Sequence, residues 1–203
     1  MQDFETLRTS TYCPFALKAK VWRLPEWHAS DRYEANIHRQ AESLAEFAQV
    51  CKPERYHGCA TRLPVDDHSN FESVKAQFHR FLVQLALHDS SCAQAMASDF
   101  LAPTWQFEFR SIRMFLNVFG ACYPKQHSKY APVESSFLVF FQPESSFDLC
   151  GTNSITKKTK QEIRDRFARA GMPYNGEQID QRIESLLYMF PVDHNSPPVR
   201  WWE

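Results

Sequence analysis

The sequence of 203 residues is short of glycine and lacks the motifs that mark the common enzyme classes. Only 5 glycines occur, and neither G-x-G-x-x-G nor G-x-x-x-x-G-K-[ST] is present, which argues against a glycine-rich phosphate-binding loop. G-x-S-x-G and H-E-x-x-H are missing as well. The sequence therefore offers no motif for a nucleotide site, a serine-hydrolase site or a zinc-peptidase site.

The chain also lacks a charge surplus and a long apolar run, and we expect no signal peptide at its N-terminus. Lys plus Arg total 23 and Asp plus Glu total 24, whereas proteins that bind nucleic acid usually carry a basic excess. No run of 18 or more apolar residues occurs, and the N-terminus has no basic region followed by an apolar one. We therefore expect a cytoplasmic protein without nucleic-acid or membrane partners, whose six cysteines are reduced thiols.

The length and the composition favour one globular domain spanning residues 1–203. A chain of this size buries a sizeable core without disulfides. Phenylalanine is frequent, with 17 residues, so we expect a core built around large aromatic side chains.

The first half of the chain predicts helices. Apolar residues recur at helical spacing over Asn36–Cys51, with Asn36 as the expected N-cap. The pattern over Asn70–His88 is the clearest one, and Asn70 is its expected cap. We expect a loop over Pro53–Ser69. For Thr11–Trp22 we expect a turn at Pro14 followed by a helical turn or a strand.

The periodicity changes after Pro103. Trp105, Phe107 and Phe109 alternate with polar residues, as in a strand. Two further strands are expected over Met114–Phe119 and Ser136–Phe141, and the second of these is expected to be central. A turn over Gln142–Asp148 follows. A helix over Thr156–Ala170, with Thr156 as its cap and Gly171 at its end, and a further helix over Gly176–Leu187 complete the prediction. The fold class that we predict is α+β: a small, mostly antiparallel sheet at about 103–142, flanked by N- and C-terminal helices.

One predicted loop, Cys122–Tyr130, combines several groups able to carry chemistry. Imidazole nitrogen or thiolate sulfur can ligate haem iron, and flanking lysines can neutralise haem propionates. Neighbouring strands would supply a flat apolar slot. The opposite interpretation, a plain aromatic core beside a solvated loop, stays open. Cys13, in the turn before Phe15, is interpreted as a buried structural thiol, and the basic helix over Lys157–Arg169 as a solvated face.

Four features in order along the chain resemble the YqcI/YcgG family. They are Cys13-Pro14-Phe15-Ala16, the Phe81-Leu82-x-x-Leu85 helix ending in His88-Asp89, Trp105-Gln106-Phe107-Glu108-Phe109 followed by Met114-Phe115, and Phe141-Gln142-Pro143 running to Phe147-Asp148 and Ile163-Arg164-Asp165-Arg166. Members of this family include haem-dependent oxygenases that hydroxylate amine or guanidine nitrogens of arginine-like amino acids. The resemblance implies haem b, with His127 as the axial iron ligand and Cys122 or Tyr123 as the alternatives.

The expected site follows from that resemblance. Lys125, Lys129, Trp105, Phe107 and Phe115 would line the cofactor. Glu108 and Asp148 would bind a small amine or guanidine substrate, and dioxygen and an electron donor would be co-reactants. The chain departs from the family pattern at Pro124-Lys-Gln-His127, so two alternatives remain: a haem-binding or sensing module without turnover, and a cofactor-free interaction protein. In the second case Trp201 and Trp202 would form a docking patch, although they could equally pack back on the domain. A homodimer is one possible assembly.

Overall fold

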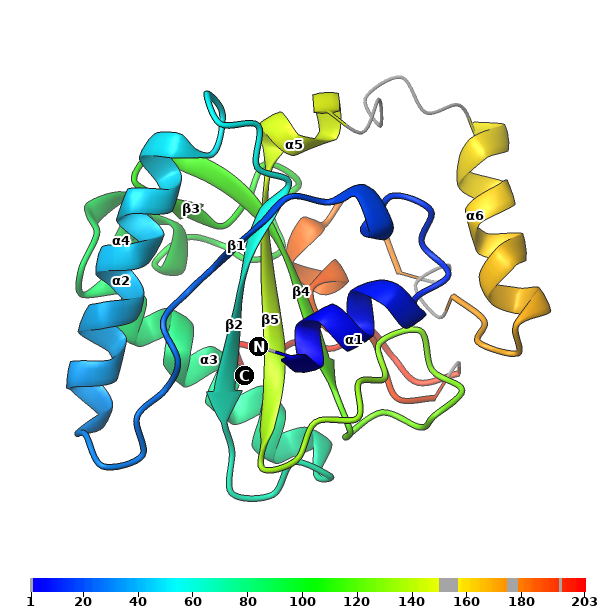
Figure 1. Ribbon diagram of the computed structural model, residues 1–203, viewed down its shortest axis with the longest axis horizontal. Coiled ribbons are helices and arrows are strands. Elements are labelled where there is room, and N and C mark those ends of the chain that lie inside the picture. Colours follow the sequence, from blue (N-terminus) through cyan, green and yellow to red (C-terminus); the bar gives the residue numbers. More distant parts are fainter. Residues whose placement is uncertain (1, 150–156, 175–178, 194) are drawn as a thin grey trace.

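A computed structural model describes residues 2–149, 157–174, 179–193 and 195–203 (Figure 1). Within these residues the fold is mixed α/β, with six α-helices and a five-stranded sheet in the order β1-β2-β5-β4-β3. The strands are β1 (Val21–Arg23), β2 (Gly58–Pro64), β3 (Glu108–Phe109), β4 (Ile112–Gly120) and β5 (Ser136–Pro143). β1 pairs with β2 in parallel, and the other three pairings are antiparallel.

The sheet is larger than the one expected at about 103–142, because β1 and β2 come from the N-terminal part of the chain. The predicted loop Pro53–Ser69 was wrong, since it contains β2. All but two residues of β2 are buried, so its sequence lacks the polar alternation that identifies a strand with one wet face. The crossover from β1 to β2 runs through helix α2, as a parallel connection requires.

The helices are α1 (Gln2–Ser10), α2 (Tyr33–Val50), α3 (Phe71–Ala86), α4 (Ser90–Met96), α5 (Glu144–Leu149) and α6 (Lys157–Arg169), with 3-10 turns η1 (Ala16–Lys18) and η3 (Glu184–Leu187). The cap at Asn70 is confirmed, since its side chain accepts hydrogen bonds from the amides of Glu72 and Ser73. The predicted cap at Asn36 was wrong: α2 starts at Tyr33, and the Asn36 side chain binds the backbone of His28.

Three further boundaries differ from the sequence prediction. The expected turn Gln142–Asp148 contains α5, and strand β3 covers only the last two residues of the Trp105–Phe109 run. The described part of the expected helix Gly176–Leu187 holds only η3. Gly171, with φ of 73°, ends the last turn after α6 as expected; the proposed cap Thr156 lies outside the described residues.

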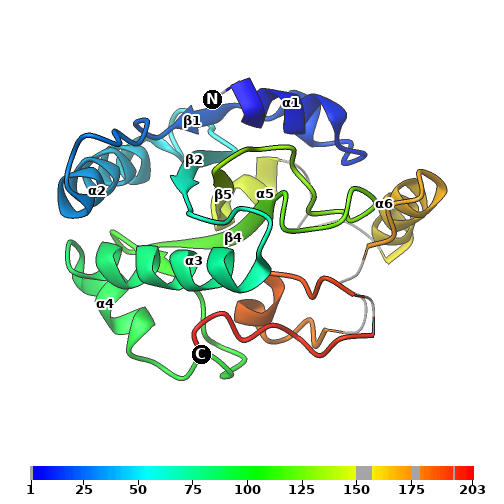
Figure 2. The same ribbon diagram turned by 90° about the horizontal axis from the view of Figure 1, so that it is seen from below.

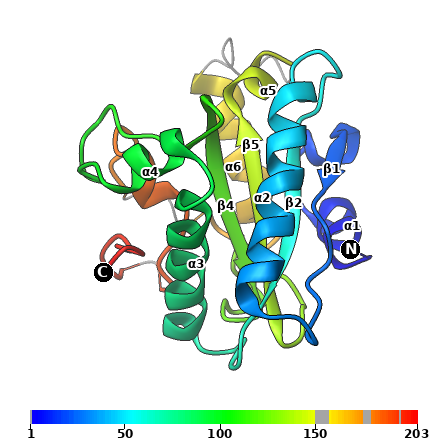
Figure 3. The ribbon, with the colours of Figure 1, turned by 90° about the vertical axis from the view of Figure 1, so that its left-hand side faces the viewer.

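Helices cover both faces of the sheet (Figures 2 and 3). The main core packs α2 and α3 against one face, through Leu44, Phe47, Phe78 and Phe81 and the inward residues of β4 and β5. A smaller cluster packs Phe4 and Leu7 of α1 against the other face. Because side chains alternate along β4, Met114, Leu116 and Val118 enter the main core, and Phe115, Asn117 and Phe119 face the side of α1 and α6.

The C-terminal tail belongs to the core rather than to a docking patch. Trp201 is fully buried, and its indole N–H donates to the Ser185 carbonyl at 2.8 Å. Its ring packs edge-on against Phe78 with centroids 5.1 Å apart, and Trp202 stacks on Phe100 at 4.9 Å. Of the two placements that the sequence left open for this pair, a docking patch or packing against the domain, Trp201 adopts the second. No helix in the described ranges is long and apolar enough to span a bilayer.

Candidate functional site

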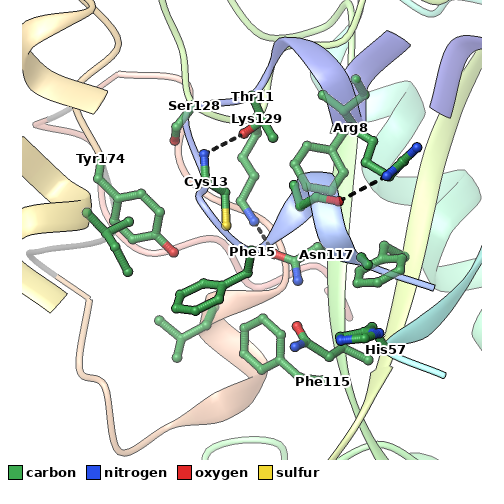
Figure 4. A pocket seen from close by; sticks show the side chains of 18 of the residues that line it. Arg8, Thr11, Cys13, Phe15, His57, Phe115, Asn117, Ser128, Lys129 and Tyr174 are labelled. Carbon is green, nitrogen blue, oxygen red and sulfur yellow. Dashed lines mark hydrogen bonds between the residues drawn. The ribbon is translucent and has the colours of Figure 1, made fainter. Parts of the chain in front are cut away.

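A cavity of about 720 Å³ lies between the outer face of β4 and β5, helix α1, the turn at Cys13–Ala16 and helix α6 (Figure 4). Its volume falls in the range of small-molecule and cofactor sites, roughly 300–1,000 Å³. The walls are mainly aromatic, from Phe4, Phe15, Phe115, Phe119, Phe140, Phe147, Phe167 and Tyr174. Aromatic walls suit an apolar or flat ligand, and the few polar groups of the lining would set the orientation of that ligand.

Lys129 is the most buried polar residue of the lining. It is 3% exposed, and its ammonium donates to the Asn117 side-chain carbonyl. The rings of Phe119 and Phe190 lie 4.9 and 4.5 Å from its Nζ. Burial lowers the pKa of Lys129 to about 7. Among the described residues no carboxylate pairs with this amine, so its hydrogen-bonding partners are neutral.

The neighbours of Lys129 add polar atoms to the same part of the cavity. Cys13 lies close enough to Lys129 to interact with it electrostatically, and both side chains point into this region (Figure 4). The buried hydroxyl of Ser128 has no hydrogen-bond partner among the described residues. Thr11 accepts the Cys13 amide at 3.3 Å, so the Cys13 turn is held in place.

Glu184, in η3, supplies a carboxylate to another part of the lining. Its Oε1 accepts from the Tyr188 hydroxyl at 2.7 Å and its Oε2 from the Gln106 amide at 3.0 Å. Burial raises the pKa of Glu184. Arg113, the cation that acts on it from a distance, forms its ion pair with Glu108 at 3.8 Å.

Two other lining groups are engaged in holding the walls together. The Arg8 guanidinium pairs with Glu5 at 2.7 Å and donates to the Leu17 carbonyl at 2.7 Å, which fastens α1 to the following turn. The His57 Nδ1 accepts the Lys20 amide at 3.0 Å, so its neutral ring carries the proton on Nε2. Burial lowers the pKa of His57.

Of the residues predicted for the site, the structure brings Phe115 and Lys129 together in the cavity. Trp105 and Phe107 are buried in the main core on the opposite face of the sheet. Glu108 is on the β3–β4 hairpin in its ion pair. Lys125 is exposed in its loop, and Asp148 is exposed on α5, beside a separate hollow of about 470 Å³.

His127 lies outside the cavity lining, with both ring nitrogens in hydrogen bonds. Its Nδ1 accepts the Lys129 amide at 3.0 Å, and its Nε2 donates to the Pro191 carbonyl at 3.2 Å. The ring stacks on Tyr123 at 4.3 Å. Burial lowers the pKa of His127 to about 4. His127 is therefore a neutral, packed residue here, and coordinating iron would break one of its two bonds.

The two alternative ligands also lie outside the cavity lining. Burial raises the pKa of Cys122 to about 12 and that of Tyr123 well above its usual value, so neither thiolate nor phenolate forms readily. Haem does not fit at these three residues in this arrangement. Within the cavity, Cys13 is the sulfur donor, and sulfur is an accepted haem-iron ligand. The described residues contain no cluster of three metal-ligating side chains.

The sequence analysis did not select Asn117, Ser128 or Glu184, and it interpreted Cys13 as structural. Asn117 carried a usable signal: it is the one polar residue in the apolar run Met114–Phe119. Such a residue within a strand must find a polar partner or a ligand. The sequence around Glu184 gives no indication of a site, because the residues that contact this side chain come from distant segments.

The comparisons with known proteins give one match. No curated protein and no solved structure matches the chain significantly. The sequence model of the YqcI/YcgG family matches residues 11–180, which include Cys13, Asn117, Lys129 and most of the cavity wall. The match spans well over half of the chain, and the protein belongs to the YqcI/YcgG family.

Proposed function

We propose that this protein is a haem-dependent oxygenase that hydroxylates a nitrogen of an amine or guanidine in an amino-acid-like substrate, with the cavity as its active site. The observation that carries the proposal is the aromatic cavity of about 720 Å³ with a thiol in its wall. Haem b would lie among the aromatic rings, held at its iron by Cys13 instead of the expected His127. Bound haem supplies an iron centre that activates dioxygen.

The residues of the chain contribute enclosure and orientation. Phe115, Phe119 and Phe140 give the sheet wall of the cavity an apolar surface, which excludes water from the substrate. Lys129 and Glu184 add charges of opposite sign to that lining. Placing a substrate nitrogen at a fixed position beside the cofactor is the part of the reaction that the protein scaffold provides.

The test is the visible spectrum of the purified protein reconstituted with haemin. We expect a Soret band whose carbon monoxide adduct has the red shift of thiolate ligation. Cys13→Ser should abolish that shift, whereas His127→Gln, altered outside the cavity, should keep it. A colourless protein that takes up no haemin would refute the proposal, and loss of the band only in His127→Gln would return the ligand role to His127.

The haem-binding module without turnover differs from an oxygenase in its products. A single-turnover assay of the haem-loaded protein with dioxygen, a reductant and arginine or lysine separates the two. Formation of an N-hydroxylated product supports the oxygenase. Haem binding without product favours the sensing module, and absence of haem binding favours the cofactor-free interaction protein.

A further inference from the structure

The Lys129 side chain is an amine buried in the wall of an aromatic cavity. The residue is 3% exposed, and the rings of Phe119 and Phe190 lie 4.9 and 4.5 Å from its Nζ. Its side chain donates to the side-chain carbonyl of Asn117, which carries no charge (Figure 4). Such surroundings remove most of the hydration that stabilises an ammonium ion, and they favour the uncharged amine, whose lone pair can attack an electrophile.

The other charged side chains of the cavity wall leave this amine without an ion pair. Arg8, Arg164 and Glu184 line the same cavity. Arg8 is paired with Glu5 at 2.7 Å, and both carboxylate oxygens of Glu184 accept hydrogen bonds from uncharged groups. Within the part of the chain that the structure describes, no carboxylate therefore holds Lys129 in its charged form.

Ser128 supplies a second polar group beside the amine. Its hydroxyl is buried without a hydrogen-bond partner among the described residues, and the residue lines the cavity next to Lys129 in the chain. A hydroxyl in this position can donate to a carbonyl oxygen and stabilise the negative charge that develops there during addition to the carbonyl carbon. Because aromatic rings form most of the remaining wall, the cavity suits a carbonyl compound with a flat, apolar body.

We infer that Lys129 is a nucleophile that binds an aldehyde or ketone with a flat, apolar body as a covalent imine. Its uncharged Nζ adds to the carbonyl carbon, the carbonyl oxygen leaves as water with the two amine hydrogens, and a C=N bond replaces the C=O bond. The step needs neither an oxidant nor a reductant. The inference goes beyond the proposed oxygenase and does not depend on haem.

The first measurement is reductive trapping of the purified protein, with its haem content read from the Soret band. Benzaldehyde and sodium cyanoborohydride at neutral pH would convert the imine into a stable benzylated lysine, which peptide mapping by mass spectrometry locates. We expect haem-free protein to be modified at Lys129 about a hundredfold faster than at Lys125, which is exposed in the same loop. About tenfold of this preference comes from the desolvated amine, since an amine in water is almost wholly protonated at neutral pH.

Acetaldehyde is the matched probe for the apolar body. It lacks the ring that the aromatic walls would bury, so the preference for Lys129 over Lys125 should fall about tenfold. Equal modification of the two lysines by benzaldehyde, or no modification of Lys129, would overturn the inference. Equal preferences with the two aldehydes would refute the flat, apolar ligand.

The second measurement uses variants of the two polar residues. Lys129→Arg keeps a positive charge and removes the nucleophile, so the benzylated peptide should disappear, whereas Lys125→Arg should retain it. Ser128→Ala should slow the modification of Lys129 about tenfold or more, because the hydrogen bond to the carbonyl oxygen is lost. An unchanged rate in Ser128→Ala would refute the role of that hydroxyl, and the wild-type peptide map decides on Lys129 even if Lys129→Arg does not fold.

The same cavity is the proposed haem site, so the two proposals need separate outcomes. A protein that is modified at Lys129 and takes up no haemin supports the carbonyl site and refutes only the oxygenase. A protein that takes up haemin, and whose haem-free form is not modified at Lys129, refutes only the carbonyl site.

Discussion

Acid should destabilise this protein through His127, because the fold holds the ring neutral. The ring is 3% exposed and its two nitrogens are committed to the Lys129 amide and the Pro191 carbonyl. Protonating Nδ1 would replace this acceptor with an N–H group, which would then face the N–H of Lys129. The perturbation that isolates this effect is His127→Gln, whose amide keeps a donor and an acceptor but does not titrate.

The direction and the size of the loss of stability follow from the change in the pKa of His127 on folding. Burial lowers the pKa of His127 from 6.5 to about 4, so between these values the unfolded chain binds more protons than the folded one. The stability that neutral His127 contributes is complete above about pH 7 and is lost as pH falls toward the folded pKa. The loss amounts to about 2 kcal/mol at pH 5 and about 3 kcal/mol at pH 4.

The assay is urea unfolding of both proteins at a series of pH values. We expect the stability difference between wild type and His127→Gln to narrow by about 2 kcal/mol between about pH 7 and pH 5. Comparing the two proteins cancels the titration of other groups, including Glu184, whose raised pKa acts in the opposite direction. Parallel curves for wild type and His127→Gln would refute the neutral, packed His127.

Three other substitutions probe the packing of the main core and of the cavity wall. Gly58→Ala should cost about 1–3 kcal/mol by thermal unfolding, because a Cβ there would lie 2.3 Å from the Phe140 ring and 2.6 Å from the Phe141 carbonyl; an unchanged melting temperature would contradict that contact. Trp201→Ala should lower the free energy of unfolding by about 4 kcal/mol in urea, as expected for a buried core tryptophan. A decrease below about 1 kcal/mol would indicate a surface position for this side chain. Lys129→Met should stabilise the ligand-free protein by about 1–3 kcal/mol, because it removes an uncompensated buried charge; a net loss of stability would show that the ammonium supports the fold.

The sequence patterns predicted the elements whose signals are local. The α3 helix combines a broad apolar stripe with an asparagine cap, and β5 is an almost uninterrupted apolar run, so both were identified close to their true bounds. Strand β2 was missed because it is buried on both faces. The strand predicted over Trp105–Phe109 was longer than the observed β3. Trp105 and Phe107 alternate with polar residues as in a strand, but they lie in an irregular segment packed on the main core.

The candidate site was harder to predict, because its parts come from distant segments. Lys129 and Phe115, which were predicted to line a cofactor, both lie in the cavity wall, and their role stays a prediction. His127 was selected from the resemblance to the family, and a sequence resemblance does not tell whether a ring nitrogen is free to bind iron. That depends on the Pro191 carbonyl, 64 positions further along the chain. The same is true of Glu184, whose partner Gln106 is 78 positions away.

The loop around His127 also explains why Lys129 matters. The Lys129 carbonyl accepts the Gly120 amide at 3.1 Å, and the Lys129 amide donates to His127. Any residue other than proline at position 129 could make these backbone bonds, so they do not require the ammonium. Its side chain nevertheless enters the cavity and carries a charge whose burial is unfavourable. The ammonium is held by the Asn117 side chain and by the Phe119 and Phe190 rings, and a bound carboxylate would supply the counter-charge that the described residues do not.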